Sequence, residues 1–293
     1  MTMTYTGVAY SFVERLAKDL QDARFELPAF PEAVLRVQRA LQSADTSAAD
    51  IVTILGSEPG LAARVVRITN SAAFKPASGA IADLRTAVSR LGFNMVRTIA
   101  MEYAMRQMRR RDALSAAART EIDAILNDSL QVASVAYVIA KRYTRINADQ
   151  ALLAGLLHGL GRLYVVMRAE EIAATAAIDV RDVAASWHAA IGKAILESWG
   201  LPEPLQHAVE HQDDRDLNPI DTVEHTGPGI PVGALTLTNV LIAAKLLAVA
   251  EDVRHAAGVP ALAWLDGMKK AGAAAVLEDH GAEIAAIRES LSE

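Results

Sequence analysis

The stretch Leu152-Leu153-Ala154-Gly155-Leu156-Leu157-His158-Gly159-Leu160-Gly161-Arg162-Leu163 is the most informative part of this sequence. It is almost wholly apolar, and it lies within residues 147–167, which we expect to form one helix. Buried polar groups are normally hydrogen-bonded, so we expect His158 to be a core histidine bonded to a neighbouring polar group. The glycines at 159 and 161 would permit helices to pack closely.

Helical signals continue on both sides of this stretch. Ser47 and Asp50 form a capping box, with Asp in place of the usual Glu, before an apolar helical face. Asp83 is placed to cap a second helix, which Gly92 ends. No segment alternates as a strand would, so the sequence predicts an all-α fold. The other helices are expected from Pro59 onward and over residues 93–111, 180–199, 203–211, 234–255 and 260–290, and residues 115–143 are expected to form one long helix or two.

Composition excludes several classes of protein. The 293 residues are 52% hydrophobic and 22% charged, which is too apolar for a disordered chain. The net charge of −6 gives no sign of a nucleic-acid-binding surface. Cysteine is absent, so disulfides, thiolate nucleophiles and cysteine-ligated zinc are excluded. No secretory signal is visible at the N-terminus, and we expect a cytoplasmic protein without membrane insertion. Polar residues interrupt the longest apolar stretch, 232–250, which is interpreted as a buried helix.

A charged segment divides the chain. Arg106, Arg109, Arg110, Arg111 and Asp112 follow one another closely, and we place a domain boundary there. The prediction is an N-terminal helical unit over residues 1–112 and a second helical unit over 113–293. The second unit contains a long loop near 213–233, rich in proline, glycine and polar residues, and a helical C-terminal tail.

Several separated motifs together resemble the HDOD family, bacterial signal-output domains related to the HD phosphohydrolases. The resemblance covers about residues 27–250. Its motifs are Leu27-Pro28-Ala29-Phe30-Pro31, Glu58-Pro59-Gly60-Leu61-Ala62, Arg67-Ile68-Thr69-Asn70-Ser71-Ala72, residues 81–92, the stretch 152–163 quoted above, and Trp199-Gly200-Leu201-Pro202. The resemblance implies an N-terminal helical bundle packed on a C-terminal HD-like bundle. It also implies an output or scaffold module in signal transduction.

The resemblance also implies where a catalytic site would lie. HD phosphohydrolases hold metal ions with a His, a His-Asp pair and a later Asp, and the metal generates hydroxide from bound water. Here the His-Asp pair corresponds to His158 and Gly159, so the carboxylate is missing. The first His falls near Asp128, and the later Asp falls near Lys245, whose charge would repel a metal. We therefore expect these four positions to form a vestigial pocket without metal, cofactor or catalysis.

Two other functions stay open beside this one. An active metal-dependent HD-type phosphohydrolase or phosphodiesterase would need metal at the pocket despite Gly159. A regulator could instead bind a nucleotide in the vacated pocket without turnover. A separate motif, His207-Ala208-Val209-Glu210-His211, matches a zinc-hydrolase pattern, but it has no strong candidate for a third ligand.

The expected partner is a signalling protein that acts in trans, bound through the groove between the two bundles. Asn70 and Arg162 are candidate contacts for a ligand or a partner, although an ion pair within the chain explains Arg162 more simply. The alanine-rich helices at either end of the chain are candidates for a homodimer interface, but packing within their own domain explains them more simply.

Overall fold

The computed structural model describes residues 7–22, 31–75, 79–109, 114–171, 180–214, 235–249, 262–266 and 273–292. Every regular element in these ranges is a helix, which confirms the all-α prediction. The helices are α1 Gly7–Asp22, α2 Glu32–Ala40, α3 Ala48–Gly56, α4 Pro59–Thr69, α5 Leu84–Met108, α6 Ala116–Tyr143, α7 Ala148–Leu157, α8 Leu160–Glu171, α9 Val180–Ser198, α10 Glu203–Glu210, α11 Leu237–Val249, α12 Ala263–Asp266 and α13 Ala273–Ser292.

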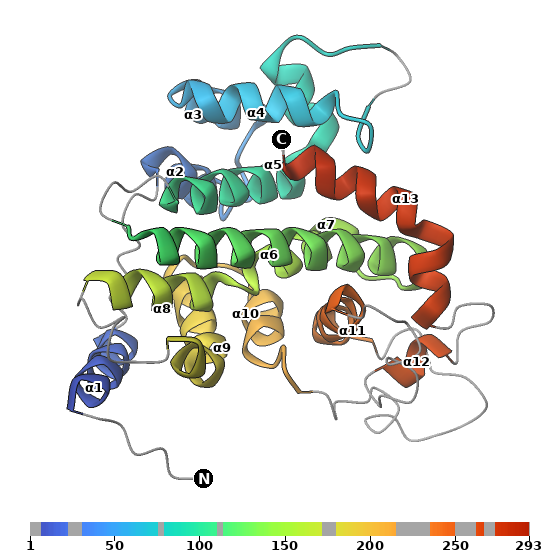
Figure 1. The fold of residues 1–293 in the computed structure, drawn as a ribbon. Coiled ribbons are helices and arrows are strands. Elements are labelled where there is room, and N and C mark those ends of the chain that lie inside the picture. Colours follow the sequence, from blue (N-terminus) through green and yellow to red (C-terminus); the bar gives the residue numbers. More distant parts are fainter. Residues whose placement is uncertain are drawn as a thin grey trace.

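Helix α6 is the central element. It crosses the middle of the molecule, with α2 to α5 on one side and α8 to α11 on the other (Figure 1). It packs most extensively against α7, and also against α8, α11 and α13. Helix α6 and the segment Ala148–Glu170 are long and apolar enough to cross a membrane, but 67% and 89% of their most apolar windows are buried inside the protein. Core helices of soluble proteins have these same properties, and α11, in the apolar stretch 232–250, is also largely buried.

The two predicted units share one hydrophobic core. A continuous cluster of buried side chains runs from Phe12 in α1 to Leu291 in α13, and α5 packs directly on α7. Gln42, after α2, donates to the carbonyl oxygens of Trp199 (3.0 Å) and Gly200 (3.1 Å) at the turn before α10. The boundary residues 110–112 lie outside the described residues, so the division at residue 112 stays a prediction.

The predicted helix boundaries around residues 47–92 are confirmed. The Ser47 side chain accepts from the N–H of Asp50, and the Asp50 carboxylate accepts from the N–H of Ser47 (2.9 Å). Asp83 accepts from the N–H of Thr86 at the start of α5. Gly92 interrupts α5 with a φ of +76°, a backbone conformation that favours glycine, so the chain changes direction there.

The prediction of one helix over residues 147–167 was wrong in one respect. The chain turns at His158 and Gly159, which separate α7 from α8. The His158 ring Nδ1 donates to the Gly155 carbonyl oxygen (2.7 Å), the group that would accept from Gly159 N–H in an unbroken helix. The close packing expected of the two glycines is confirmed, since a Cβ at Gly161 would overlap the His188 carbonyl oxygen.

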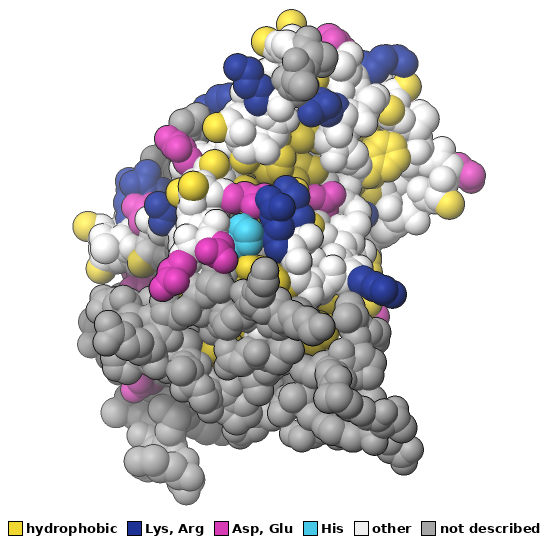
Figure 2. All heavy atoms as spheres, turned by 90° about the vertical axis from the view of Figure 1, so that its right-hand side faces the viewer, with side chains coloured by type: hydrophobic (Ala, Val, Ile, Leu, Met, Phe, Trp, Pro, Cys, Tyr) yellow, Lys and Arg dark blue, Asp and Glu magenta, His cyan; other side chains and the backbone are white. Residues whose placement is uncertain are grey.

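Helix α11 lies within the predicted helix 234–255, and α12 and α13 lie in the predicted helical tail, while residues 250–261 and 267–272 lie outside the described residues. Most of the predicted loop, residues 215–233, lies outside the described residues. Helix α13 packs along α6, and the face that carries it mixes acidic and basic side chains around apolar ones (Figure 2). Glu283 of α13 pairs with Lys141 (2.9 Å) and Arg142 (2.7 Å) at the end of α6.

A buried charge cluster ties the end of α13 to the N-terminal helices. Arg64 of α4 and Arg106 of α5 both pair with Glu102, whose side chain is almost fully buried. The same two guanidinium groups donate to the Leu291 carbonyl oxygen, at 2.5 and 3.2 Å. The cluster therefore joins elements that are far apart in the sequence, and it satisfies a carbonyl at the end of a helix.

Candidate functional site

Asp128 and His158 lie next to one another, as the prediction of a shared pocket requires. Asp128 projects from the middle of α6, and its Oδ2 is 3.3 Å from His158 Nε2. The His158 ring is fully buried, with Nδ1 on the Gly155 carbonyl oxygen and Nε2 toward Asp128. The prediction of a buried histidine bonded to a neighbouring polar group is confirmed. Burial lowers the pKa of His158, and the carboxylate of Asp128 opposes this shift.

Lys245 reaches the same site from α11. Its Nζ pairs with Asp213 Oδ1 (2.6 Å) and donates to Gln212 Oε1 (2.7 Å). Gln212 Nε2 in turn donates to the His158 carbonyl oxygen (3.2 Å), so one side chain connects the lysine to the turn between α7 and α8. Burial lowers the pKa of Lys245, and the carboxylate of Asp213 opposes that shift.

His188 is a site residue that sequence reasoning missed. It lies on α9, is almost fully buried, and its Nε2 is 3.0 Å from Asp213 Oδ2. Burial raises the pKa of Asp213, but the hydrogen bond from His188 and the charge of Lys245 lower it more, so the pKa lies well below its usual value. The spacing of His188 and Asp213 forms no motif, and only the fold brings them together.

Gly159 faces Ser129 of α6 at close range. A Cβ built on Gly159 would lie 2.5 Å from Ser129 Oγ and 2.9 Å from Ile125 Cγ2. Real Cβ atoms do not approach other atoms so closely, so neighbouring groups already occupy the place of a side chain at this position. Ser129 Oγ itself is buried without a hydrogen-bond partner among the described residues.

Each carboxylate of the site already has a cation beside it. Asp128 Oδ2 is 3.5 Å from Arg162 Nη1, which confirms the ion pair expected for Arg162. Burial raises the pKa of Asp128, but His158, Arg162 and Lys245 together lower it further, so Asp128 is ionised at neutral pH. The site therefore resembles a closed set of internal ion pairs.

The residues present do not fit a metal centre of the HD type. No group of three or more His, Cys, Asp or Glu side chains in the described ranges is arranged to hold a metal ion. The two carboxylates at the site are paired with Arg162 and Lys245, and a carboxylate at position 159 would need Ser129 to move. An ammonium group close to the same carboxylates would also oppose a divalent cation.

The His207-x-x-Glu210-His211 motif lies at the end of α10, and its side chains bind other residues. His207 Nδ1 is 2.9 Å from Thr238 Oγ1, and His211 Nδ1 is 2.8 Å from Asp214 Oδ2. Glu210 pairs with Lys193 (2.7 Å), and the two histidine rings lie against each other with centroids 4.3 Å apart. These contacts give the motif a structural explanation.

Asn70 lies away from this site, at the end of α4. Its Nδ2 donates to the carbonyl oxygens of Val66 (2.9 Å) and Ile81 (2.7 Å), and its Oδ1 accepts from the N–H of Ile81 (2.8 Å). The amide therefore holds together the two ends of the loop that precedes α5. Its role as a contact for a ligand or partner stays a prediction.

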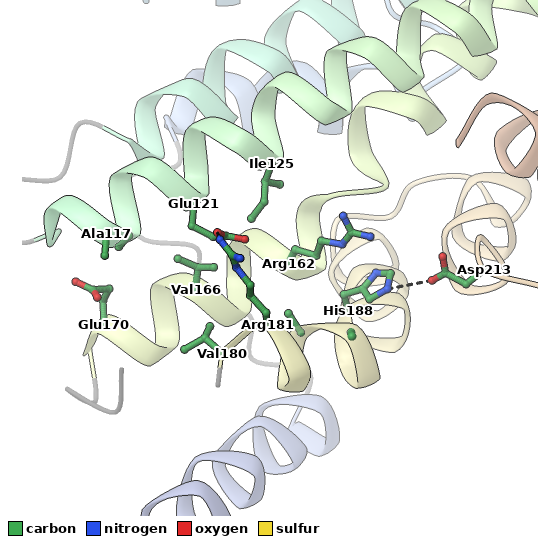
Figure 3. Close-up of a pocket in the computed structure, with 13 residues that line it drawn as sticks. Ala117, Glu121, Ile125, Arg162, Val166, Glu170, Val180, Arg181, His188 and Asp213 are labelled. Atoms are coloured by element: carbon green, nitrogen blue, oxygen red, sulfur yellow. Dashed lines mark hydrogen bonds and ion pairs between the residues drawn. The ribbon is translucent and has the colours of Figure 1, made fainter. Parts of the chain in front are cut away.

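A cavity of about 860 Å³ opens beside the polar site, between α6, α8 and α9 (Figure 3). Arg162, His188 and Asp213 lie together at one end, Glu170 lies at the opposite end, and Glu121 and Arg181 lie between. The remaining described lining is apolar and consists of Ala117, Ala118, Ile125, Val166, Val180, Ala184 and Ala185. Of the predicted site residues, only Arg162 lines this cavity.

Comparison with known proteins identifies related sequences and folds. The family model of the HDOD domain matches residues 27–215. An uncharacterized protein of Treponema pallidum (strain Nichols) is 28% identical over 212 residues, which are 67% of this chain and 39% of that protein. The chain thus spans well under half the length of this relative.

Solved structures share the fold at low sequence identity. A candidate metal-dependent phosphohydrolase from Shewanella amazonensis SB2B superposes with a TM-score of 0.71 at 23% identity, covering 98% of this chain and 100% of that one. An HDOD domain protein of unknown function from Geobacter sulfurreducens gives a TM-score of 0.62 at 21% identity, covering 95% and 98%. At these identities the similarity extends to the fold, and the chemistry must be argued from the residues of this chain.

Proposed function

The chain belongs to the HDOD domain family, and from this premise we propose that it is a non-catalytic signal-transduction module that acts by binding another protein. The observation that carries the proposal is the Lys245 ammonium group, 2.6 Å from Asp213 Oδ1 and close to Asp128 and His158. We infer that this cation lies where an HD phosphohydrolase would hold its metal, which supports the proposal. The carboxylates are neutralised without an ion, and no activated water follows from such a site.

Position 159 supports the proposal independently. A metal-binding aspartate at this position would require space that Ser129 Oγ and Ile125 Cγ2 occupy. Gly159 therefore lacks both the carboxylate and the space for one, and a single substitution at this position would not recreate the set of metal ligands. The similar fold of a candidate phosphohydrolase does not alter this inference, because the inference depends on residues of this chain.

The partner in our proposal is a signalling protein supplied in trans within the bacterial cytoplasm. The helical scaffold offers a surface for such a partner, and the carboxylates of Asp128 and Asp213 are already paired within the chain. A homodimer and a nucleotide ligand remain alternatives to a protein partner, and a nucleic-acid partner is disfavoured by the net charge of −6.

Metal content and turnover test the non-catalytic part of the proposal. The full chain, purified without chelator, is analysed for iron, manganese and zinc and assayed with bis(p-nitrophenyl) phosphate in the presence of each ion. We expect substoichiometric metal and no turnover above the buffer rate. Stoichiometric metal that is lost in His158→Ala, together with turnover that is lost in the same variant, would establish a phosphohydrolase instead.

Capture experiments test the binding part. The tagged full chain is cross-linked in native lysate, and the captured proteins are identified by mass spectrometry. We expect the same partner to be recovered with wild-type protein and with His158→Ala, because the proposal does not require an intact metal site. A chain that captures only itself, with a mass in solution of two copies, would favour the homodimer.

A further inference from the structure

We propose that the cavity between α6, α8 and α9 binds a small organic anion, with its apolar body against the alanine-rich walls and its phosphate or carboxylate on Arg162. The inference builds on the proposed regulatory function, for which this ligand would be the input signal. The cavity of about 860 Å³ has the size of known small-molecule sites, which are mostly apolar with a few polar groups.

The walls provide room for an apolar body. Ala117 and Ala118 come from α6, Val166 from α8, and Ala184 and Ala185 from α9. Small side chains on two facing helices leave depth between them, and the aliphatic groups favour a flat or apolar ligand over a strongly hydrated one.

The acidic groups of the lining are already engaged. Glu121 pairs with Arg181 (2.8 Å) in the lining of the cavity. Glu170 accepts from the N–H (2.9 Å) and the hydroxyl (3.0 Å) of Ser115 at the start of α6. Asp213 is bound by Lys245 and His188. These contacts neutralise most of the negative charge that would otherwise repel an anion.

Arg162 has unused hydrogen-bonding capacity. Its guanidinium group carries five N–H donors, and its contact with Asp128 is a single ion pair of 3.5 Å. The side chain is 34% exposed and lies at the end of the cavity that His188 and Asp213 also line (Figure 3). A planar guanidinium binds phosphate or carboxylate through two parallel hydrogen bonds, so the class of ligand follows from this group.

His188 lines the same end of the cavity as Arg162. Its side chain is almost fully buried, and Nε2 is used by Asp213. Its Nδ1 is buried and has no hydrogen-bond partner among the described residues. Nδ1 exposes almost no surface, so the polar contact that we propose for the ligand is with Arg162, and the bond to Asp213 fixes the His188 ring beside it.

Thermal-shift and calorimetric titrations of the full chain test the proposal. The anions are 2-naphthyl phosphate, 2-naphthoate and adenosine 5′-monophosphate at 1 mM, compared with 2-naphthol, adenosine and inorganic phosphate. We expect at least one anion with an apolar body to raise the Tm, because it binds the native state. The compounds that lack either the apolar body or the negative charge should raise the Tm less. A comparison of the Tm shifts with 2-naphthyl phosphate and 2-naphthoate shows whether the site prefers phosphate or carboxylate.

Two variants locate the binding. Arg162→Gln is expected to lower the affinity for the anion about tenfold or more, because charge-assisted hydrogen bonds are lost. Ala185→Leu, at an exposed position of the cavity wall, is expected to lower the affinity for the anion, because the larger side chain fills the space for the apolar body. Arg142→Gln, at the far end of α6, is the matched control and should bind as the wild type does.

The proposal fails if none of the three anions shifts the Tm, or if an anion binds Arg162→Gln and Ala185→Leu as tightly as the wild type. Capture of the protein partner by Arg162→Gln separates this outcome from failure of the proposed function. If the variant no longer binds the anion but still captures the partner, the proposed protein-binding function does not depend on the anion site.

Discussion

Gly159 shows how one residue determines what the site can hold. We expect Gly159→Ala to lower the free energy of unfolding by about 1–3 kcal/mol, since its Cβ would lie 2.5 Å from Ser129 Oγ. The measurement is urea denaturation. Gly281→Ala is the control, because Gly281 lies in α13 with nothing within 4 Å of the new Cβ. The double variant Ser129→Ala/Gly159→Ala should recover part of the loss, and equal stability of Gly159→Ala and wild type would contradict the close contact.

His158 gives the protein a pH-dependent stability. Burial lowers the pKa of the folded-state ring below its ordinary value of 6.5. The unfolded chain therefore takes up a proton first, and this contribution to stability is complete above pH 6.5 and is lost as the pH falls below it. We expect His158→Gln to flatten the slope of unfolding free energy between pH 7 and 5, which is at most about 1.4 kcal/mol per pH unit. His280→Gln is the control, and an unchanged slope in His158→Gln would refute the expectation.

At the scale of residues, the sequence predicted one half of the site and missed the other. Asp128, His158 and Lys245 were identifiable because family motifs place them, and the structure brings them together. Gln212 and His188 were missed because their contacts depend on how α9 and α10 pack, and no local spacing records that packing.

Among the elements, the loop before α5 depends on one amide group. Asn70 makes three hydrogen bonds to the backbone at the two ends of this loop. We expect Asn70→Ala to lower the free energy of unfolding by about 1–3 kcal/mol and to speed hydrogen exchange at the Ile81 amide, which Asn70 binds. Exposed Asn127 on α6 supplies the control, Asn127→Ala. Unchanged exchange at Ile81 would show that the loop is held by other contacts.

Helix starts and stops differed in how well the sequence predicted them. Caps and a glycine with positive φ act within a few residues, so the boundaries near Ser47, Asp83 and Gly92 were predictable. The break between α7 and α8 was not predictable, because it depends on the hydrogen bond from the His158 ring to the Gly155 carbonyl oxygen of the same helix. Helix α1 was also missed. Phe12 and Leu16, four residues apart and buried, were the signal that could have revealed it.

For the whole molecule, the continuous core predicts a single unfolding transition. All three tryptophans, Trp187, Trp199 and Trp264, lie beyond residue 112, whereas circular dichroism reports helices in both predicted units. We expect the two signals to give the same urea midpoint, because one hydrophobic cluster spans both units. Displaced midpoints would mean that residues 1–112 and 113–293 unfold separately.

The charge cluster around Glu102 also constrains how the protein is made. Arg64 and the Leu291 carbonyl that it binds are 227 residues apart in sequence. At translation rates of roughly 5–20 residues per second, the ribosome reaches Leu291 about 10–45 s after Arg64. Helices α4 and α5 are thus synthesised before α13 exists, and the bonds of Arg64 and Arg106 to the Leu291 carbonyl oxygen can form only after α13 has been made.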